Sequence, residues 1–217
     1  MIGKNVTSLP AEVPALLQAK EERLVHCAAI ILARCPEKRP ELMANMMQAF
    51  RRARKSDTRQ ALIKSWSTFG HDAEAAMPIL LEIIANPKKY PYGEVIGACR
   101  SAAGIAADSS QDFPQLVTLL TQRLRSAPHY SIKQVAAEAL GRLGKKARPA
   151  IPALIVLLRK DVHYMQSWAA HALTRIDATD PRVKEVLSWY AKHGKWVKLR
   201  QRLKDYLAGK SNALVTQ

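Results

Sequence analysis

A gapless internal repeat constrains the fold of this 217-residue chain more than any other feature of its sequence. When the chain is shifted by 74 residues, segment 59–84 falls on segment 133–158. The identities across this shift include Gln60 with Gln134, Gly70 with Gly144, Ala73 with Ala147, Ala76 with Ala150, Pro78 with Pro152 and Leu80 with Leu154. A shift of 38 places Pro114 on Pro152, so the basic period is about 34–38 residues. Periods of this length indicate arrays of helical hairpins.

Each repeat is predicted to contain two helices. In the clearest copy, one apolar face comprises Val135, Ala136, Ala139, Leu140 and Leu143. Gly144 then ends the first helix in a left-handed conformation, and Pro149 or Pro152 occupies the first turn of the second. The second apolar face comprises Ile151, Leu154, Ile155 and Leu158. Because neither helix can bury its face alone, neighbouring hairpins must stack into a solenoid.

Segment 135–158, VAAEALGRLGKKARPAIPALIVLL, resembles the HEAT-like repeats of the phycobilisome-lyase type. The matching features are the alanine pair, the leucine-glycine ending of the first helix and the AIPAL opening of the second. The resemblance implies an all-α fold. It does not select a function, because such repeats occur in scaffolds, in partners of enzymes and in nucleic-acid binders.

We therefore expect an all-α solenoid of about five HEAT-like hairpins with a C-terminal capping helix, in one domain spanning residues 1–208. The predicted units are about 21–55, 57–89, 92–126, 130–160 and 163–193, followed by a helix at about 195–208. Residues 209–217 are predicted to form a flexible tail.

The chain is strongly basic, with 34 lysines and arginines against 18 acidic residues and a formal net charge of +16. The charge rises along the sequence, from +1 over residues 1–50 to +7 over residues 181–217. A positive field of this size attracts nucleic acid, acidic protein or an anionic membrane.

Basic side chains cluster at the ends of the predicted second helices, in the turn at 145–148 and along the last helix. The candidate phosphate contacts are Arg51, Arg52, Arg54, Lys55, Lys88, Lys89, Arg123, Arg125, Lys145, Lys146, Arg148, Arg159, Lys160, Lys195, Lys198, Arg200, Arg202 and Lys204. A structural alternative remains open, because cations near helix C-termini also stabilise the helix dipole. The basic last helix can likewise serve only as a cap, with its apolar face on the preceding repeat.

Aromatic residues recur at the unit boundaries, at Tyr90, Tyr92, Tyr130 and Tyr164. Beside basic clusters, such rings could stack on bases. The favoured interpretation is structural: if Ser131 is the N-cap, Tyr130 forms a hydrophobic staple with Val135. Asp57, Asp112 and Asp180 are predicted N-caps.

No catalytic, metal or cofactor motif is recognisable, so we expect no cofactor and no enzymatic activity. A minor alternative is an alkylpurine DNA glycosylase built from HEAT-like repeats, which would use a tryptophan and an acidic residue. Trp66 aligns with core position Leu140 and is predicted to pack inside. Cys27, Cys35 and Cys99 form no CxxC pair and are expected to be buried free thiols.

Residues 1–20 lack the basic start and apolar run of a secretory signal, and the apolar stretch Ala150–Leu158 is too short to span a bilayer. The expected location is therefore intracellular and cytoplasmic, with nucleoid or nuclear association as an alternative. The leading hypothesis is a non-enzymatic protein that binds DNA or RNA through phosphate contacts. The main alternative is a scaffold for an acidic protein, and peripheral binding to an anionic membrane is a minor one.

Overall fold

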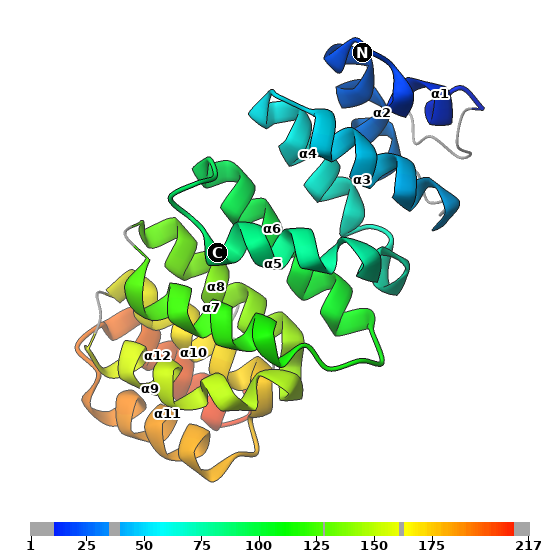
Figure 1. Cartoon of the computed structure of the whole chain (residues 1–217). Helices are drawn as coiled ribbons and strands as arrows, with labels where there is room; N and C mark the ends of the chain where they lie inside the picture. Colours follow the sequence, from blue (N-terminus) through cyan, green and yellow to red (C-terminus); the bar gives the residue numbers. More distant parts are fainter. Residues whose placement is uncertain (1–10, 35–39, 128, 161–162, 211–217) are drawn as a thin grey trace. The chain divides into compact units, whose positions relative to one another are not determined.

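A computed structural model describes residues 11–34, 40–127, 129–160 and 163–210 of the chain. All regular structure in these ranges is helical, and they contain no strand (Figure 1). The chain divides into two compact units, residues 1–112 (unit 1) and 113–217 (unit 2). The predicted tail at 209–217 lies outside the described residues except for Gly209 and Lys210.

Unit 1 is built from helices that alternate between two layers. They are α1 (Val13–Gln18), α2 (Glu22–Arg34), η1 (Pro40–Leu42), α3 (Met43–Arg52), α4 (Ser56–Trp66), η2 (Gly70–Ala76), α5 (Met77–Ala85) and α6 (Tyr92–Asp108). Helix α4 packs between α2 and α6, while α3 contacts α1 and α5 contacts α6. The first helices of successive hairpins thus form one layer, and the second helices lie over it.

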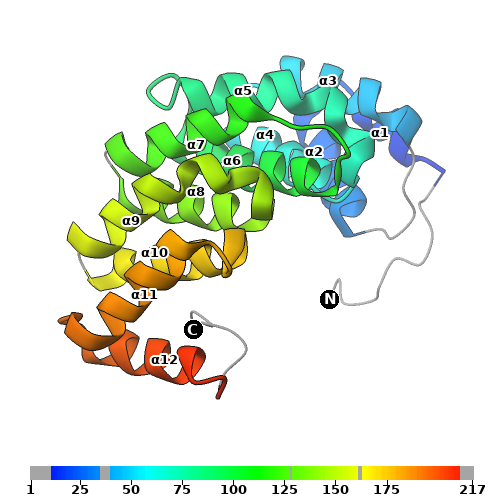
Figure 2. The ribbon, with the colours of Figure 1, turned by 90° about the horizontal axis from the view of Figure 1, so that it is seen from below.

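Unit 2 repeats this arrangement. Its helices are α7 (Pro114–Ser126), α8 (Tyr130–Leu143), η3 (Gly144–Ala150), α9 (Ile151–Lys160), α10 (His163–Asp177), α11 (Pro181–His193) and α12 (Val197–Leu207). The first helices α8 and α10 pack on each other, while the second helices α7, α9 and α11 contact one another in sequence. Helix α12 lies against α11 at the end of the unit (Figure 2). The predicted fold class, an all-α solenoid of stacked hairpins with a C-terminal helix, is confirmed.

The 74-residue repeat corresponds to a repeated backbone geometry. Gly70 and Gly144 both have a φ of +57°, a conformation that side chains with a Cβ rarely adopt. Each glycine is the first residue of a seven-residue 3₁₀ segment, η2 or η3, which is followed by a helix with proline in its first turn. The prediction that Gly144 ends the first helix at positive φ is therefore confirmed, although its ψ of −137° is not that of a left-handed helix.

The predicted apolar faces form the core. The five residues of the first face, from Val135 to Leu143, are all buried, as are Ile151, Leu154 and Leu158 on the second. Ile155 is only half-buried. Trp66 is completely buried against Phe50, with ring centroids 5.2 Å apart, which confirms its predicted packing role.

Three details of the sequence interpretation are wrong. Helix α4 begins at Ser56 with Lys55 as N-cap, so Asp57 lies in the first turn instead of capping it. The N-cap of α7 is Phe113, which leaves Asp112 outside the helix. Cys27 is exposed because it lies on the outer side of α2, while Cys99 is buried as expected and Cys35 lies outside the described residues. The third acid, Asp180, does cap α11 by accepting the Arg182 N–H.

Candidate nucleic-acid interface

Positive charge is concentrated in unit 2. This unit has 19 lysines and arginines against six acidic residues, a net charge of +13, whereas unit 1 has 15 against 12, a net charge of +3. The gradient of charge along the sequence therefore corresponds to a difference in net charge between the two compact units. The positive electrostatic field is therefore stronger around unit 2 than around unit 1.

In unit 1, the cluster from Arg51 to Lys55 holds α1 and α2 in place. The Arg52 guanidinium donates to the Leu17 and Gln18 carbonyls at 3.0 and 3.5 Å, at the C-terminal end of α1. Glu22 accepts the Lys55 and Arg54 N–H groups at 2.8 and 2.6 Å, and these bonds hold the pKa of Glu22 below its usual value. Arg52 thus has a structural role, while the side chains of Arg51, Arg54 and Lys55 are exposed.

The second cluster of unit 1 is also partly neutralised. Lys89 Nζ lies 2.8 Å from Glu82 Oε1, and the Tyr90 hydroxyl donates to the same oxygen at 2.7 Å. The hydrogen bond from Lys89 is the main cause that lowers the pKa of Glu82. Lys88 is exposed beside this network. Unit 1 therefore has nearly balanced charge, and one cation of each cluster, Arg52 or Lys89, is engaged within the fold.

In unit 2, a groove of about 360 Å³ lies where α7 and α9 end and α8 begins. It is lined by Leu124, Arg125, Lys133, Ala153, Val156, Leu157 and Lys160. Three of these residues are cationic, and none of the described lining residues is acidic. The predicted contacts Arg125 and Lys160 thus come together, joined by Lys133, which was missed because it lies in a first helix.

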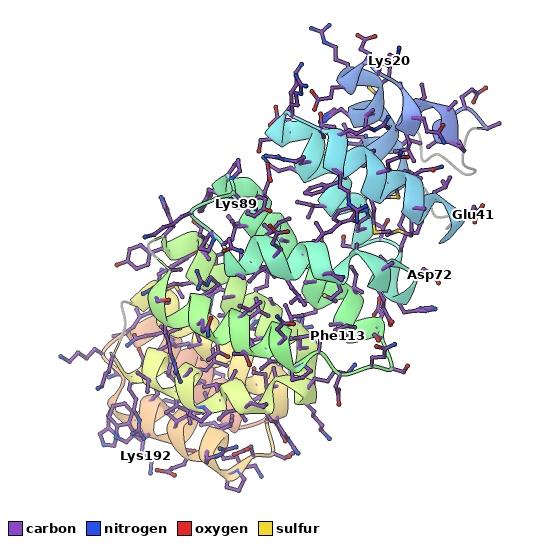
Figure 3. All side chains as sticks on the ribbon, viewed as in Figure 1. Lys20, Glu41, Asp72, Lys89, Phe113 and Lys192 are labelled. Atoms are coloured by element: carbon purple, nitrogen blue, oxygen red, sulfur yellow. The ribbon has the colours of Figure 1, made fainter. Side chains whose placement is uncertain are left out.

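The basic surface continues from α9 to α11. The Arg159 guanidinium carbon lies 5.6 Å from the centre of the Trp189 ring, a cation–π contact on a tryptophan that is 42% exposed. Lys192, one turn along α11, projects into solvent (Figure 3). We call Arg125, Lys133, Arg159, Lys160 and Lys192 the basic edge. Apart from Lys133 at the start of α8, it follows the C-terminal ends of α7, α9 and α11, as the repeat predicts for second helices.

Two exposed tyrosines lie at the same end of the hairpins. Helix α8 begins at Tyr130, whose ring is 56% exposed, so the predicted staple with buried Val135 is wrong. Lys133 Nζ lies 6.0 Å from the centre of the Tyr130 ring. Tyr164, in the first turn of α10, is 50% exposed, and its hydroxyl donates to Gln134 of α8. The rings are therefore placed beside the cations of the groove.

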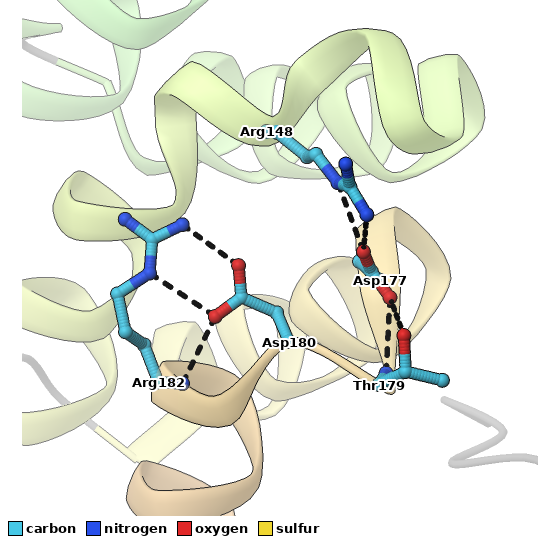
Figure 4. A network of polar contacts seen from close by, with 5 residues as sticks. All are labelled: Arg148, Asp177, Thr179, Asp180 and Arg182. Carbon is cyan, nitrogen blue, oxygen red and sulfur yellow. Dashed lines mark hydrogen bonds and ion pairs between the residues drawn. The ribbon is translucent and has the colours of Figure 1, made fainter.

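The cations of the turn, Lys145, Lys146 and Arg148, lie in η3, at the opposite end of α8 and α9 from the groove. Arg148 forms an ion pair with the buried Asp177 carboxylate, which also accepts hydrogen bonds from the Thr179 hydroxyl and N–H (Figure 4). The Thr179 hydroxyl and Arg148 hold the pKa of Asp177 far below its usual range. Arg148 therefore fastens η3 to α10, and Lys145 is exposed beside it.

The last helix buries Leu199 and Leu203 and packs on α11, as its predicted capping role requires. Arg200 is half-buried, and its guanidinium donates to the Gly194 carbonyl at 3.3 Å. The exposed cations here are Lys195, Lys198, Arg202 and Lys204. They form a second basic surface on unit 2, carried by a different helix from the basic edge. Arg123, the remaining candidate, is half-buried on α7.

The described residues show no sign of a metal centre or a membrane span. No group of three or more histidine, cysteine, aspartate or glutamate side chains among them is arranged to hold a metal ion. No helix in the described ranges is both long and apolar enough to cross a bilayer.

Comparison with known proteins supports the repeat interpretation. Residues 117–208 match the protein-family model described as HEAT repeats. No curated protein matches the chain. HEAT repeats build helical scaffolds that mediate protein interactions and are generally not enzymes. The HEAT-like resemblance is thus confirmed, while the phycobilisome-lyase subtype stays a prediction.

Proposed function

We propose that this HEAT-repeat chain is a non-enzymatic nucleic-acid-binding protein that contacts phosphates through the basic edge of unit 2. One observation carries the proposal: cations from α7, α8 and α9 come together around a groove without an acidic residue among its described lining, and the contact of Arg159 with Trp189 links this surface to α11. Unit 1 has similar residues at similar repeat positions, but its hydrogen bonds to Leu17, Gln18 and Glu82 engage Arg52 and Lys89 within the fold.

The charge of the basic edge exceeds what helix stability requires. A helix C-terminus is equivalent to about half a negative charge, which one cation near the last turn compensates. The groove gathers Arg125, Lys133 and Lys160, and Lys133 is in the first turn of its helix, where a cation is unfavourable to the dipole. Repulsion within such a group is relieved by phosphates, so the arrangement favours a polyanionic partner.

Fluorescence anisotropy with labelled DNA and RNA oligonucleotides at low salt tests this function. We expect binding that depends little on sequence, because phosphate contacts carry no sequence information. Replacing Arg125, Lys133 and Lys160 by glutamine should weaken the affinity by about tenfold or more.

The matched control replaces Arg51, Lys55 and Lys88 of unit 1 by glutamine. These side chains are exposed, and the change in net charge is identical. We expect the control variant to bind almost as the wild type does. Absence of binding at low salt, or an equal loss in both variants, would contradict the proposal.

A second candidate is a scaffold for an acidic protein segment. It is favoured by Val156, which is 53% exposed within the groove and adjoins Leu157, an apolar surface that phosphates do not use. A peptide with acidic and apolar side chains would complement this lining. Complex formation with such a partner that survives nuclease and high salt, and is lost on Val156→Asp, would favour this candidate.

A further inference from the structure

Tyr130 and Tyr164 occupy equivalent positions in successive repeats of unit 2. A shift of 34 residues places one on the other, each in the first turn of a first helix, and both rings are half exposed or more. Helices α8 and α10 pack directly on each other. The repeat thus presents two exposed tyrosines at the same end of the α8–α10 pair, and the hydrogen bond from Tyr164 to Gln134 joins the two helices there.

These rings adjoin the basic edge. Lys133 belongs to the groove with Arg125 and Lys160, and its ammonium also lies 6.0 Å from the centre of the Tyr130 ring. Lys160 ends α9 only three residues before α10 begins, and Tyr164 is the second residue of α10. The cations of the groove and the two exposed tyrosines therefore share one end of the α8–α10 layer.

The Tyr164 ring is held in a defined orientation. Its hydroxyl donates to the Gln134 side chain on α8, and its edge meets Trp168 with ring centroids 6.4 Å apart and planes at 72°. With both contacts in place, the residue Tyr164 is still 50% exposed. A ring fixed in this way loses little conformational freedom when a planar ligand stacks on it.

Single-stranded and duplex nucleic acids differ in what they offer to such rings. A duplex presents phosphates and base edges, whereas the faces of its bases are stacked on each other. A single strand can turn its bases outward and stack them on aromatic side chains while its phosphates meet cations. The combination of Tyr130, Tyr164 and the basic edge fits the single strand.

We infer that the basic edge selects single-stranded nucleic acid, with successive bases stacked on Tyr130 and Tyr164 and the backbone held by Arg125, Lys133 and Lys160. This inference rests on the proposed function, because it assigns a substrate class to the same surface. Stacking contributes about 1–3 kcal/mol per base, so each tyrosine accounts for roughly a fivefold or larger part of the affinity.

The test compares a single strand with the duplex of the same sequence, both carrying 2-aminopurine as a stacking reporter and a label for anisotropy. We expect the wild type to prefer the single strand and to change its 2-aminopurine fluorescence. Tyr130→Ala with Tyr164→Ala should lose the fluorescence change and about 25-fold or more in single-strand affinity, with duplex affinity retained. Tyr130→Phe should behave as the wild type does, because the ring is kept and the hydrogen bond from the Tyr164 hydroxyl to Gln134 is untouched.

Tyr92→Ala is the control, since Tyr92 is exposed and lies in the first turn of α6 in unit 1. This variant should bind the single strand as the wild type does. If the alanine pair binds the single strand normally, or if the wild type binds both forms equally, the inference is wrong while the basic edge still binds phosphates. If the wild type binds neither form, the proposed function fails together with the inference.

Discussion

At the scale of single residues, basic side chains of similar exposure have different roles, because their neighbours in the fold differ. Arg148 and Lys160 are both exposed cations in the second half of a hairpin. Arg148 is committed to the buried Asp177 carboxylate, whereas Lys160 borders a groove whose described lining contains no acid. The first stabilises the fold, and the second is available to a ligand. Sequence spacing alone cannot separate these two cases, since the partner of Arg148 is 29 positions away.

The ion pair at Asp177 predicts a specific dependence of stability on pH. The pKa of Asp177 is lower in the folded chain than in the unfolded chain, so its contribution is complete at neutral pH. That contribution is lost as the pH falls below about 4, the ordinary carboxyl range. In urea unfolding followed by circular dichroism, Asp177→Asn should be less stable than the wild type at pH 7.

This difference between the two proteins should shrink toward pH 3. A difference that stays constant over the same pH range would show that Asp177 acts by packing alone. Arg148→Gln should also lower the free energy of unfolding at pH 7, and the double variant should be less destabilised than the two single effects added together.

The thiols provide a second prediction at this scale. Cys27 is exposed on α2 and Cys99 is buried in α6. In a Cys35→Ser background, we expect one thiol to react rapidly with an aromatic disulfide reagent and the other to react only after unfolding. Adding Cys27→Ser should abolish the rapid phase, whereas rapid reaction that persists in that variant would contradict the assigned burial.

At the scale of helices, the close approach of α8 and α10 depends on Gly141. A Cβ at this position would lie 3.1 Å from the Ala172 Cα, so a larger side chain must push α10 away. Gly141→Val should therefore destabilise the protein by about 1–3 kcal/mol, as overpacking usually does. Thermal unfolding measures this loss. Gly141→Ala, which adds only the Cβ, should destabilise the protein less than Gly141→Val, and equal unfolding temperatures for Gly141→Val and the wild type would contradict the close approach.

The exposed cations of helix α12 lead to a prediction about nucleic-acid binding. Lys198 and Arg202 are exposed, so their replacement by glutamate should leave the buried face of Leu199 and Leu203 intact. If α12 adds to the binding surface of unit 2, this reversal should weaken nucleic-acid binding more than the equal reversal of Arg51 and Lys88 in unit 1. If both charge reversals weaken nucleic-acid binding equally, α12 is not part of the binding surface. Arg200 is left unchanged because it donates to the Gly194 carbonyl.

The helices and their order could be predicted because repeat period, glycine and proline act locally. Gly70 and Gly144, at positive φ, lie where the first helix of their repeats ends. The buried apolar side chains recur with the helical period. The candidate site was only partly predictable. The sequence indicates cations at second-helix ends, but Lys133 joins them only because α8 begins where α7 and α9 end. Tyr130 was misassigned since the true helix start lies one residue before the predicted N-cap.

At the scale of the whole chain, the two units carry similar repeats and very different charge. Unit 1, at +3, has nearly balanced charge, whereas unit 2, at +13, repels itself and attracts anions. Repulsion of this kind destabilises a compact unit, so a bound polyanion should stabilise it. We therefore expect the Tm of the chain to rise when a single-stranded oligonucleotide is added at low salt. The rise should be absent in the variant with glutamine at positions 125, 133 and 160.

The salt dependence of binding tests the central claim most directly. For a single strand, the logarithm of the binding constant falls with the logarithm of salt concentration by about 0.7 for each phosphate neutralised. Five contacts from the basic edge predict a slope of about −3.5, and the glutamine variant at Arg125, Lys133 and Lys160 should reduce its size by about 2. The matched variant at Arg51, Lys55 and Lys88 should keep the wild-type slope. A slope that is unaffected by the basic-edge variant, or that is reduced equally by both, would contradict nucleic-acid binding by this surface.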